Sequence, residues 1–226
     1  MTIIITDDVI MFREMIFSAC IKERHHVIAS LSTASETLAL CFTHHPDVLF
    51  LDARLPDSNG IAISHDISKF SPSTKIIIVS AYTSDLFFLK LSKAPIFGFI
   101  DKTTDTSKAI AVALKSAFIG KRFFSSSYQQ AIRRQNNDPE FFGKLLTNRE
   151  QEVLRLIALA QTDEEIACEL GIAARTVQGH RSNLITKLNV DGTPKLIQFA
   201  INNGFNYFSL LFTLMIFNII MNVSEI

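Results

Sequence analysis

The first 120 residues contain five short apolar runs, and four of these runs stop at a charged or hydroxyl-bearing residue. The runs cover residues 2–6, 26–30, 47–51, 75–79 and 96–100. Uninterrupted apolar runs of about five residues are typical of strands covered on both faces of a parallel sheet. The stretches between them place apolar residues at helical spacing, at 11–22, 33–43, 62–70 and 106–118. The pattern predicts a doubly wound α/β domain with five parallel strands.

Polar side chains follow four of the predicted strands. Asp7 and Asp8 follow the first strand, Asp52 the third, Ser80 the fourth and Lys102 the fifth. Ligands of such sheets bind at the carboxyl ends of the strands, so these side chains are expected to converge there. Clustered carboxylates repel one another unless a divalent cation neutralises them, and Mg²⁺ prefers oxygen ligands. A carboxylate beside Mg²⁺ can accept a phosphoryl group, which Lys102 and Ser80 can bind.

Each of these residues also has a simpler interpretation when it is taken alone. Asp8 could cap the helix that begins near Val9, Ser80 could be a cap or turn residue, and Lys102 could be a solvated lysine. Their joint placement at successive strand ends favours a phosphoryl site.

These residues resemble the CheY-like receiver domains of two-component response regulators over residues 1–120, which implies a flavodoxin-like fold. The matching pattern consists of Asp7-Asp8, Asp52 with Pro56 and Gly60 behind it, Ser80-Ala81 and Lys102. The resemblance implies that a sensor histidine kinase phosphorylates Asp52. It also implies no enzymatic activity beyond Mg²⁺-assisted self-phosphorylation and dephosphorylation.

The resemblance also assigns individual roles at this site. The metal would be held by Asp8 and Asp52, by the Arg54 backbone carbonyl and, through a water, by Asp7. Ser80 and Lys102 would form the phosphoryl-binding switch, with Phe99 as the aromatic that follows it. Phe99 could equally be a buried strand residue.

Residues 121–143 lack a sustained apolar period and are predicted to be an interdomain linker. A short polar helix over 128–137 is left open. From residue 144, Thr147 with Glu150 and Thr162 with Glu165 form two capping boxes that open helices. The second of these helices ends at Gly171, and a third runs over about 174–188, which predicts a helix-turn-helix in an all-α domain.

The charge distribution favours a DNA-binding surface only in one segment of the chain. The chain has 22 Lys and Arg and 22 Asp and Glu, so no global field favours nucleic acid. The predicted third helix, however, carries Arg175, Arg181 and Lys187 and no acidic residue over 174–190. A generic helical module can have a similar pattern.

Residues 144–204 resemble the LuxR-type helix-turn-helix through LTxREQEVL, EIAxxLGI, RTVxxH and NxxxKL. Joined to a receiver, this module is typical of the NarL/FixJ subfamily of response regulators. The resemblance implies binding to double-stranded DNA and, through a fourth helix over 194–203, a homodimer when the receiver is phosphorylated. The residues that would contact DNA are Arg175, Thr176, Gln178, Gly179, Ser182, Asn183 and Lys187.

The predicted function is thus phosphorylation-dependent control of transcription, in which the unphosphorylated receiver masks the DNA-binding domain. One alternative is an aspartate-based phosphohydrolase, but haloacid-dehalogenase-type enzymes use a DxD motif, whereas Ala53-Arg54 follow Asp52. The other alternative is a membrane-tethered regulator, because the tail over 205–226 is strongly apolar. We favour packing of that tail on the protein or on a dimer partner, and membrane contact is left open.

The three cysteines are far apart, odd in number and never spaced as CxxC. This argues against a disulfide framework and a zinc site. The short apolar stretch at the N-terminus lacks the features of a signal peptide. We therefore expect the protein in the reducing cytoplasm.

Overall fold

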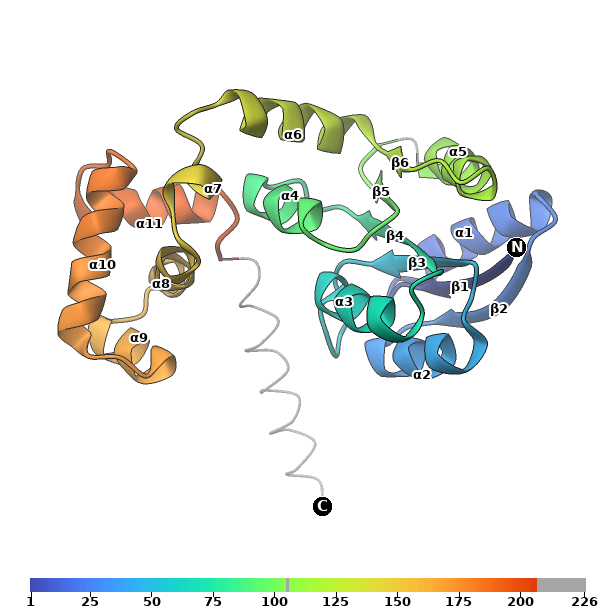
Figure 1. Cartoon of the computed structure of the whole chain (residues 1–226), viewed down its shortest axis with the longest axis horizontal. Coiled ribbons are helices and arrows are strands. Elements are labelled where there is room, and N and C mark those ends of the chain that lie inside the picture. The colour runs from blue at the N-terminus through green and yellow to red at the C-terminus, as the bar shows by residue number, and fades with distance from the viewer. Residues whose placement is uncertain (105, 207–226) are drawn as a thin grey trace, which may run out of the picture. The chain divides into compact units, whose positions relative to one another are not determined.

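The computed structural model of the chain describes residues 1–104 and 106–206 (Figure 1). The chain divides into two compact units. The first comprises Met1–Thr83 and Lys90–Ile132, and the second comprises Ser84–Leu89 and the chain from Arg133 onward. Of the predicted tail over 205–226, residues 207–226 lie outside the described residues. None of the helices in the described ranges is long and apolar enough to span a membrane.

The first unit is built on a parallel sheet. Its strands are β1 (Thr2–Thr6), β2 (His26–Leu31), β3 (Val48–Asp52), β4 (Lys75–Ser80), β5 (Gly98–Asp101) and β6 (Phe123–Phe124), in the order β2-β1-β3-β4-β5-β6. The helices of this unit include α1 (Ile10–Lys22), α2 (Ala34–His44), α3 (Gly60–Phe70) and α5 (Thr106–Phe118); α4 (Asp85–Ser92) follows β4 in the chain and belongs to the second unit as far as Leu89. The predicted doubly wound α/β class is confirmed.

The central strands are apolar on both faces because helices cover both faces. Ile3, Ile5 and Phe50 pack in one core with Ile16 of α1 and Leu114 of α5. Ribbons α1 and α5 lie on one side of the sheet in Figure 1, and α2 and α3 lie on the other. Every residue of β3 is buried, which explains why polar and apolar residues do not alternate along this strand.

The strand count of five was wrong by one, because the predicted linker contributes a strand. Phe123 and Phe124 pair in parallel with Gly98 and Phe99 and form β6. Close approach at this edge needs Gly98, since an added Cβ would lie 2.6 Å from the Phe123 carbonyl oxygen. The linker continues as α6 (Ser126–Asn137), so the polar helix that the sequence left open is present.

The second unit contains a helical bundle. Its helices are α7 (Phe142–Leu145), α8 (Asn148–Ala158), α9 (Asp163–Leu170), α10 (Ala174–Lys187) and α11 (Gly192–Asn202). Both predicted capping boxes are present, at Thr147 with Glu150 and at Thr162 with Glu165. Gly171 ends α9 with a φ of 63°, a left-handed conformation that glycine adopts readily. The predicted helix-turn-helix, α9 followed by α10, is confirmed.

Candidate functional site

Three ionised side chains meet at the carboxyl edge of the sheet. The Lys102 Nζ lies 2.7 Å from Asp7 Oδ2 and 2.8 Å from Asp52 Oδ2. The side chains of Lys102, Asp7 and Asp52 are 6%, 0% and 8% exposed. One ammonium group therefore faces two carboxylates away from bulk water.

Local backbone geometry holds the two carboxylates in place. Asp7 Oδ1 accepts a hydrogen bond from Val9 N, and Asp52 Oδ1 accepts one from Arg54 N. The turn behind Asp52 folds back tightly, and a Cβ on Gly60 would lie 2.1 Å from the Asp52 carbonyl oxygen. Glycine is therefore required at position 60 for the turn that follows Asp52.

Burial dominates the electrostatics of the two carboxyl groups. Burial is the main cause that raises the pKa of Asp52 to about 6; the charge of Asp7 acts in the same direction, and Lys102 opposes both. The pKa of Asp7 is also raised by burial, although Lys102 lowers it. A single ammonium group does not compensate two desolvated carboxylates, so the site favours an additional cation.

The acidic cluster fits a hard divalent cation. Oxygens of Asp7, Asp8 and Asp52 lie within 4.8 Å of one another. Asp8 is exposed and does not cap α1, because the N-cap position is Val9 and makes no side-chain cap bond. The exposed carboxylate beside two buried ones leaves a solvent-facing approach to an ion that all three could bind.

Ser80 and Phe99 flank the cluster. Ser80 is fully buried, its carbonyl accepts a hydrogen bond from Lys102 N at 2.9 Å, and its hydroxyl accepts one from Tyr82 N at 3.0 Å. Within the described ranges, no hydrogen bond joins this hydroxyl to Asp52. Phe99 is fully buried, and its ring centroid lies 6.1 Å from that of Tyr128 on α6.

Two contacts of the site were missed by sequence reasoning. The Lys102 Nζ lies 4.5 Å from the centroid of the Phe12 ring. The Arg54 guanidinium donates a hydrogen bond to the Tyr82 hydroxyl. Phe12 lies in the first turn of the helix that follows Asp7-Asp8. This position was the one sequence signal that Phe12 borders the acidic cluster.

The predicted recognition helix, α10, exposes its predicted DNA contacts. All seven of those side chains or positions are exposed, namely Arg175, Thr176, Gln178, Gly179, Ser182, Asn183 and Lys187. Val177 and Leu184 are fully buried and hold the opposite face in the core. A Cβ added at Gly179 would meet no atom within 4 Å, so this part of the exposed face is open.

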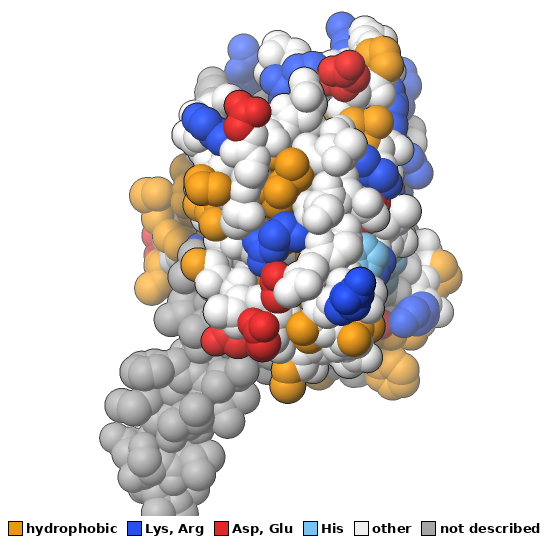
Figure 2. Space-filling model, turned by 90° about the vertical axis from the view of Figure 1, so that its left-hand side faces the viewer, with side chains coloured by type: hydrophobic (Ala, Val, Ile, Leu, Met, Phe, Trp, Pro, Cys, Tyr) orange, Lys and Arg blue, Asp and Glu red, His pale blue; other side chains and the backbone are white. Residues whose placement is uncertain are grey.

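Two of the three basic side chains of α10 are paired within the unit. Arg181 Nε lies 3.0 Å from Asp163 Oδ1, and Lys187 Nζ lies 2.9 Å from Glu150 Oε1. Arg175 makes no ion pair with any described residue. The side of the molecule that faces the viewer in Figure 2 shows separate basic groups with acidic and hydrophobic side chains between them.

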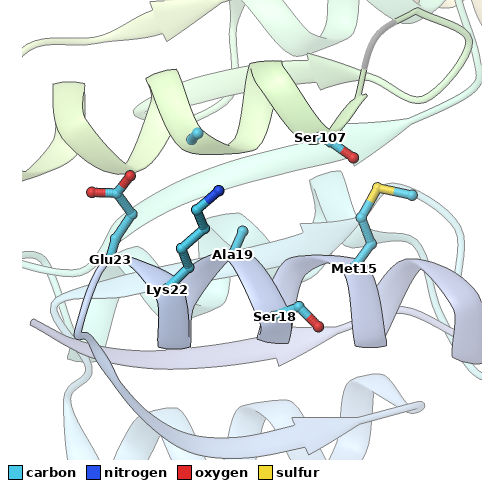
Figure 3. Close-up of a pocket in the computed structure, with 7 residues that line it drawn as sticks. Met15, Ser18, Ala19, Lys22, Glu23 and Ser107 are labelled. Carbon is cyan, nitrogen blue, oxygen red and sulfur yellow. The ribbon is translucent and has the colours of Figure 1, made fainter.

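A pocket of about 280 Å³ lies apart from the acidic cluster, between α1 and α5 (Figure 3). Met15, Ala19 and Lys22 line it from α1, and Ser107 lines it from α5. The pocket lacks the grouped carboxylates and buried ammonium of the sheet edge. The acidic cluster at the sheet edge, rather than this pocket, is therefore the candidate functional site of the first unit.

Two family models match this chain. The model of the response regulator receiver domain matches residues 3–114. The model of the bacterial regulatory proteins of the luxR family matches residues 144–200. The two matches occur in the order predicted from the sequence.

Relatives and solved structures resemble nearly the whole chain. It is 28% identical over 214 residues to the oxygen regulatory protein NreC of Staphylococcus epidermidis, over 89% of this chain and 97% of that protein. It is 25% identical over 181 residues to the response regulator UvrY of Escherichia coli, over 79% and 83% of the two chains. RcsB from Salmonella enterica serovar Typhimurium, bound to promoter DNA, aligns with a TM-score of 0.64 at 21% identity, over 90% and 98% of the chains. This last similarity supports the fold.

Proposed function

The chain belongs to the NarL/FixJ subfamily of response regulators, and from this premise we propose that phosphorylation of Asp52 controls its binding to double-stranded DNA. The observation that carries the proposal is the buried cluster of Asp7, Asp52 and Lys102 at the sheet edge. We take residues 1–120 as the receiver, 121–143 as the linker and 144–204 as the DNA-binding domain. The cytoplasm is the compartment that a DNA partner requires.

The proposed reaction forms an acyl phosphate on Asp52. A carboxylate oxygen of Asp52 attacks phosphorus on the phosphohistidine of a sensor kinase, the P–N bond breaks, and the imidazole leaves. The Lys102 Nζ lies 2.8 Å from Asp52 Oδ2. In the proposed reaction, this ammonium group exchanges its ion pair with Asp52 for one with a phosphoryl oxygen. Mg²⁺, held by Asp7, Asp8 and Asp52 with the Arg54 carbonyl, would offset negative charge on the transferred group.

A shift of negative charge supports a switch at this site. Formation of the acyl phosphate moves negative charge from the Asp52 carboxylate onto the phosphoryl oxygens and increases it, and Lys102 and the Ser80 hydroxyl are the groups proposed to bind those oxygens. In the proposed switch, Ser80 leaves its bond with Tyr82 N, and Phe99 follows by repacking against its neighbours. Self-dephosphorylation, the attack of water on this acyl phosphate, would end the signal.

Readout is proposed to occur through α10. Gln178 can read adenine in the major groove, while Arg175 can contact a backbone phosphate. A homodimer formed through α11 would address two half-sites. RcsB, a structural relative, has been solved as two dimers bound to two parallel DNAs.

The phosphorylation step is tested with the purified full-length protein, Mg²⁺ and acetyl phosphate. Intact mass should rise by one phosphoryl group in the wild type and stay unchanged in Asp52→Asn. Asp66→Asn is the matched control, because that carboxylate lies on α3, is 56% exposed and is not a member of the acidic cluster. Phosphoryl uptake by Asp52→Asn equal to that of the wild type would contradict the proposal.

A further inference from the structure

Lys102 is held from three sides, and one of these sides carries no charge. Its ammonium group contacts the carboxylates of Asp7 and Asp52, and the ring of Phe12 covers it at 4.5 Å. Phe12 is fixed in the first turn of α1, where its N–H donates to the Val9 carbonyl. Sequence motifs of the acidic cluster do not include this aromatic residue.

An aromatic ring has a particular advantage at this position. Its face is electron-rich and attracts a cation, but the ring adds no net negative charge. A third carboxylate there would repel an incoming phosphoryl group. The ring also displaces water from one side of the ammonium, which leaves its N–H groups directed to the carboxylates.

We propose that Phe12 is a positioning residue for phosphoryl transfer, and that it acts through Lys102. The inference rests on the proposed phosphorylation of Asp52. With the ring present, the ammonium is preorganised for the phosphoryl oxygens that arrive at Asp52. Without it, water solvates the ammonium and the lysine side chain gains alternative rotamers, so the barrier to transfer rises.

The experiment measures initial rates of phosphorylation of the full-length protein by acetyl phosphate with Mg²⁺, over a range of donor concentrations. Phe12→Leu, which keeps an apolar side chain but removes the ring, should lower the maximal rate by about three- to thirty-fold. The donor concentration at half-maximal rate should change less. Phe12→Tyr keeps the ring and should restore most of the rate.

A double-mutant cycle separates positioning from general packing. In a Lys102→Ala background, Phe12→Leu should cause no further loss, because the ammonium that the ring contacts is gone. Phe17→Leu is the matched control: it makes the same substitution on α1, at a side chain that is 43% exposed and outside the cluster. It should react at the wild-type rate.

Each contrary outcome has a separate meaning. A wild type that takes up no phosphoryl group would overturn the proposed function and this inference with it. A phosphorylated wild type with an equally fast Phe12→Leu variant would overturn the inference alone. An equal loss with Lys102→Ala present would also overturn it, because the effect would then be independent of the ammonium. If Phe12→Leu melts below the assay temperature, Phe12→Met takes its place in the same cycle.

Discussion

Each unit of the molecule contains a lysine paired with carboxylate groups, but the two clusters are balanced in opposite ways. In the first unit, Lys102 faces both Asp7 and Asp52, and burial raises the pKa of both carboxyl groups. In the second unit, Lys187 and the Thr147 N–H and hydroxyl all bond Glu150. Burial acts to raise the pKa of Glu150, but these bonds together hold it below its usual value.

The number of donors around each carboxylate distinguishes a structural cluster from a reactive one. Glu150 has enough donors for its charge, so its ionisation stabilises the fold. Asp52 shares one ammonium group with a second carboxylate, so its ionisation costs free energy until another cation compensates it. Such an imbalance supports the proposal that Asp52, rather than Glu150, is the group prepared for chemistry.

The largest stability effect is expected from Glu150→Ala. It removes the bonds to Thr147 and the partner of Lys187, and should lower the stability of the second unit by about 3 kcal/mol. Hydrogen exchange of peptides from that unit in the full chain measures this loss. Glu152→Ala, whose pair with Arg149 is exposed, should change stability by less than about 0.5 kcal/mol. Equal losses in the two variants would remove the distinction between the clusters.

Asp52→Asn should raise the stability of its unit, whereas Glu150→Ala should lower the stability of the other. A pKa of about 6, against an ordinary value of 3.8, means that ionisation at pH 7 destabilises the folded receiver. The neutral amide should therefore raise its stability by about 1–3 kcal/mol. Hydrogen exchange of first-unit peptides measures the gain, with the exposed Asp66→Asn as the control. A destabilised Asp52→Asn variant would show that the ionised carboxylate is structurally satisfied after all.

Acidification should change the stability of the two units of the wild type in opposite directions. The raised pKa of Asp52 means that the first unit gains stability as pH falls through about 6 toward 3.8. The lowered pKa of Glu150 means that the second unit keeps this contribution above about 4.5 and loses it as pH falls through the folded pKa. Stabilities derived from exchange between about pH 7 and 3, after correction for the intrinsic pH dependence of amide exchange, should therefore rise for the first unit below about pH 6 and fall for the second unit below about pH 4.5, and a common direction would contradict the comparison.

Sequence patterns predicted the parts of these clusters that depend on local order. The β-strands were identifiable because strands such as β3 are buried throughout, and the strand ends then placed Asp7, Asp52 and Lys102 at one edge. The capping boxes were identifiable because Thr147 and Glu150 are only three residues apart. These features follow from short-range spacing.

Contacts between distant segments could not be predicted in this way. Lys187 and Glu150 are 37 residues apart, and no local pattern indicates that α10 would lay its last turn against the start of α8. The two-residue strand β6 is too short for a period, and the eight-residue α4 was not identified. The contact of Phe12 with Lys102 joins the first turn of α1 to the residue that follows β5, 90 residues later in the chain.

The smallest effects should appear on α10. Arg175 is exposed and makes no ion pair within the described chain, so Arg175→Ala should reduce the salt dependence of duplex DNA binding by about one counterion. Lys187→Ala should reduce it less, because Glu150 already neutralises that ammonium. Titrations of both variants with a mixed-sequence duplex at several salt concentrations give the two slopes. A larger reduction for Lys187→Ala would mean that the ion pair breaks on DNA.

We propose that phosphorylation at Asp52 controls DNA binding by the exposed helix α10 of the other unit. Genome-wide DNA occupancy of the wild type and of Asp52→Ala, expressed at equal levels in the native bacterium, tests this most directly. We predict that the wild type occupies specific promoters under the activating signal and that Asp52→Ala loses most of those peaks. Equal occupancy by both proteins would contradict the account and show that the receiver does not control DNA binding.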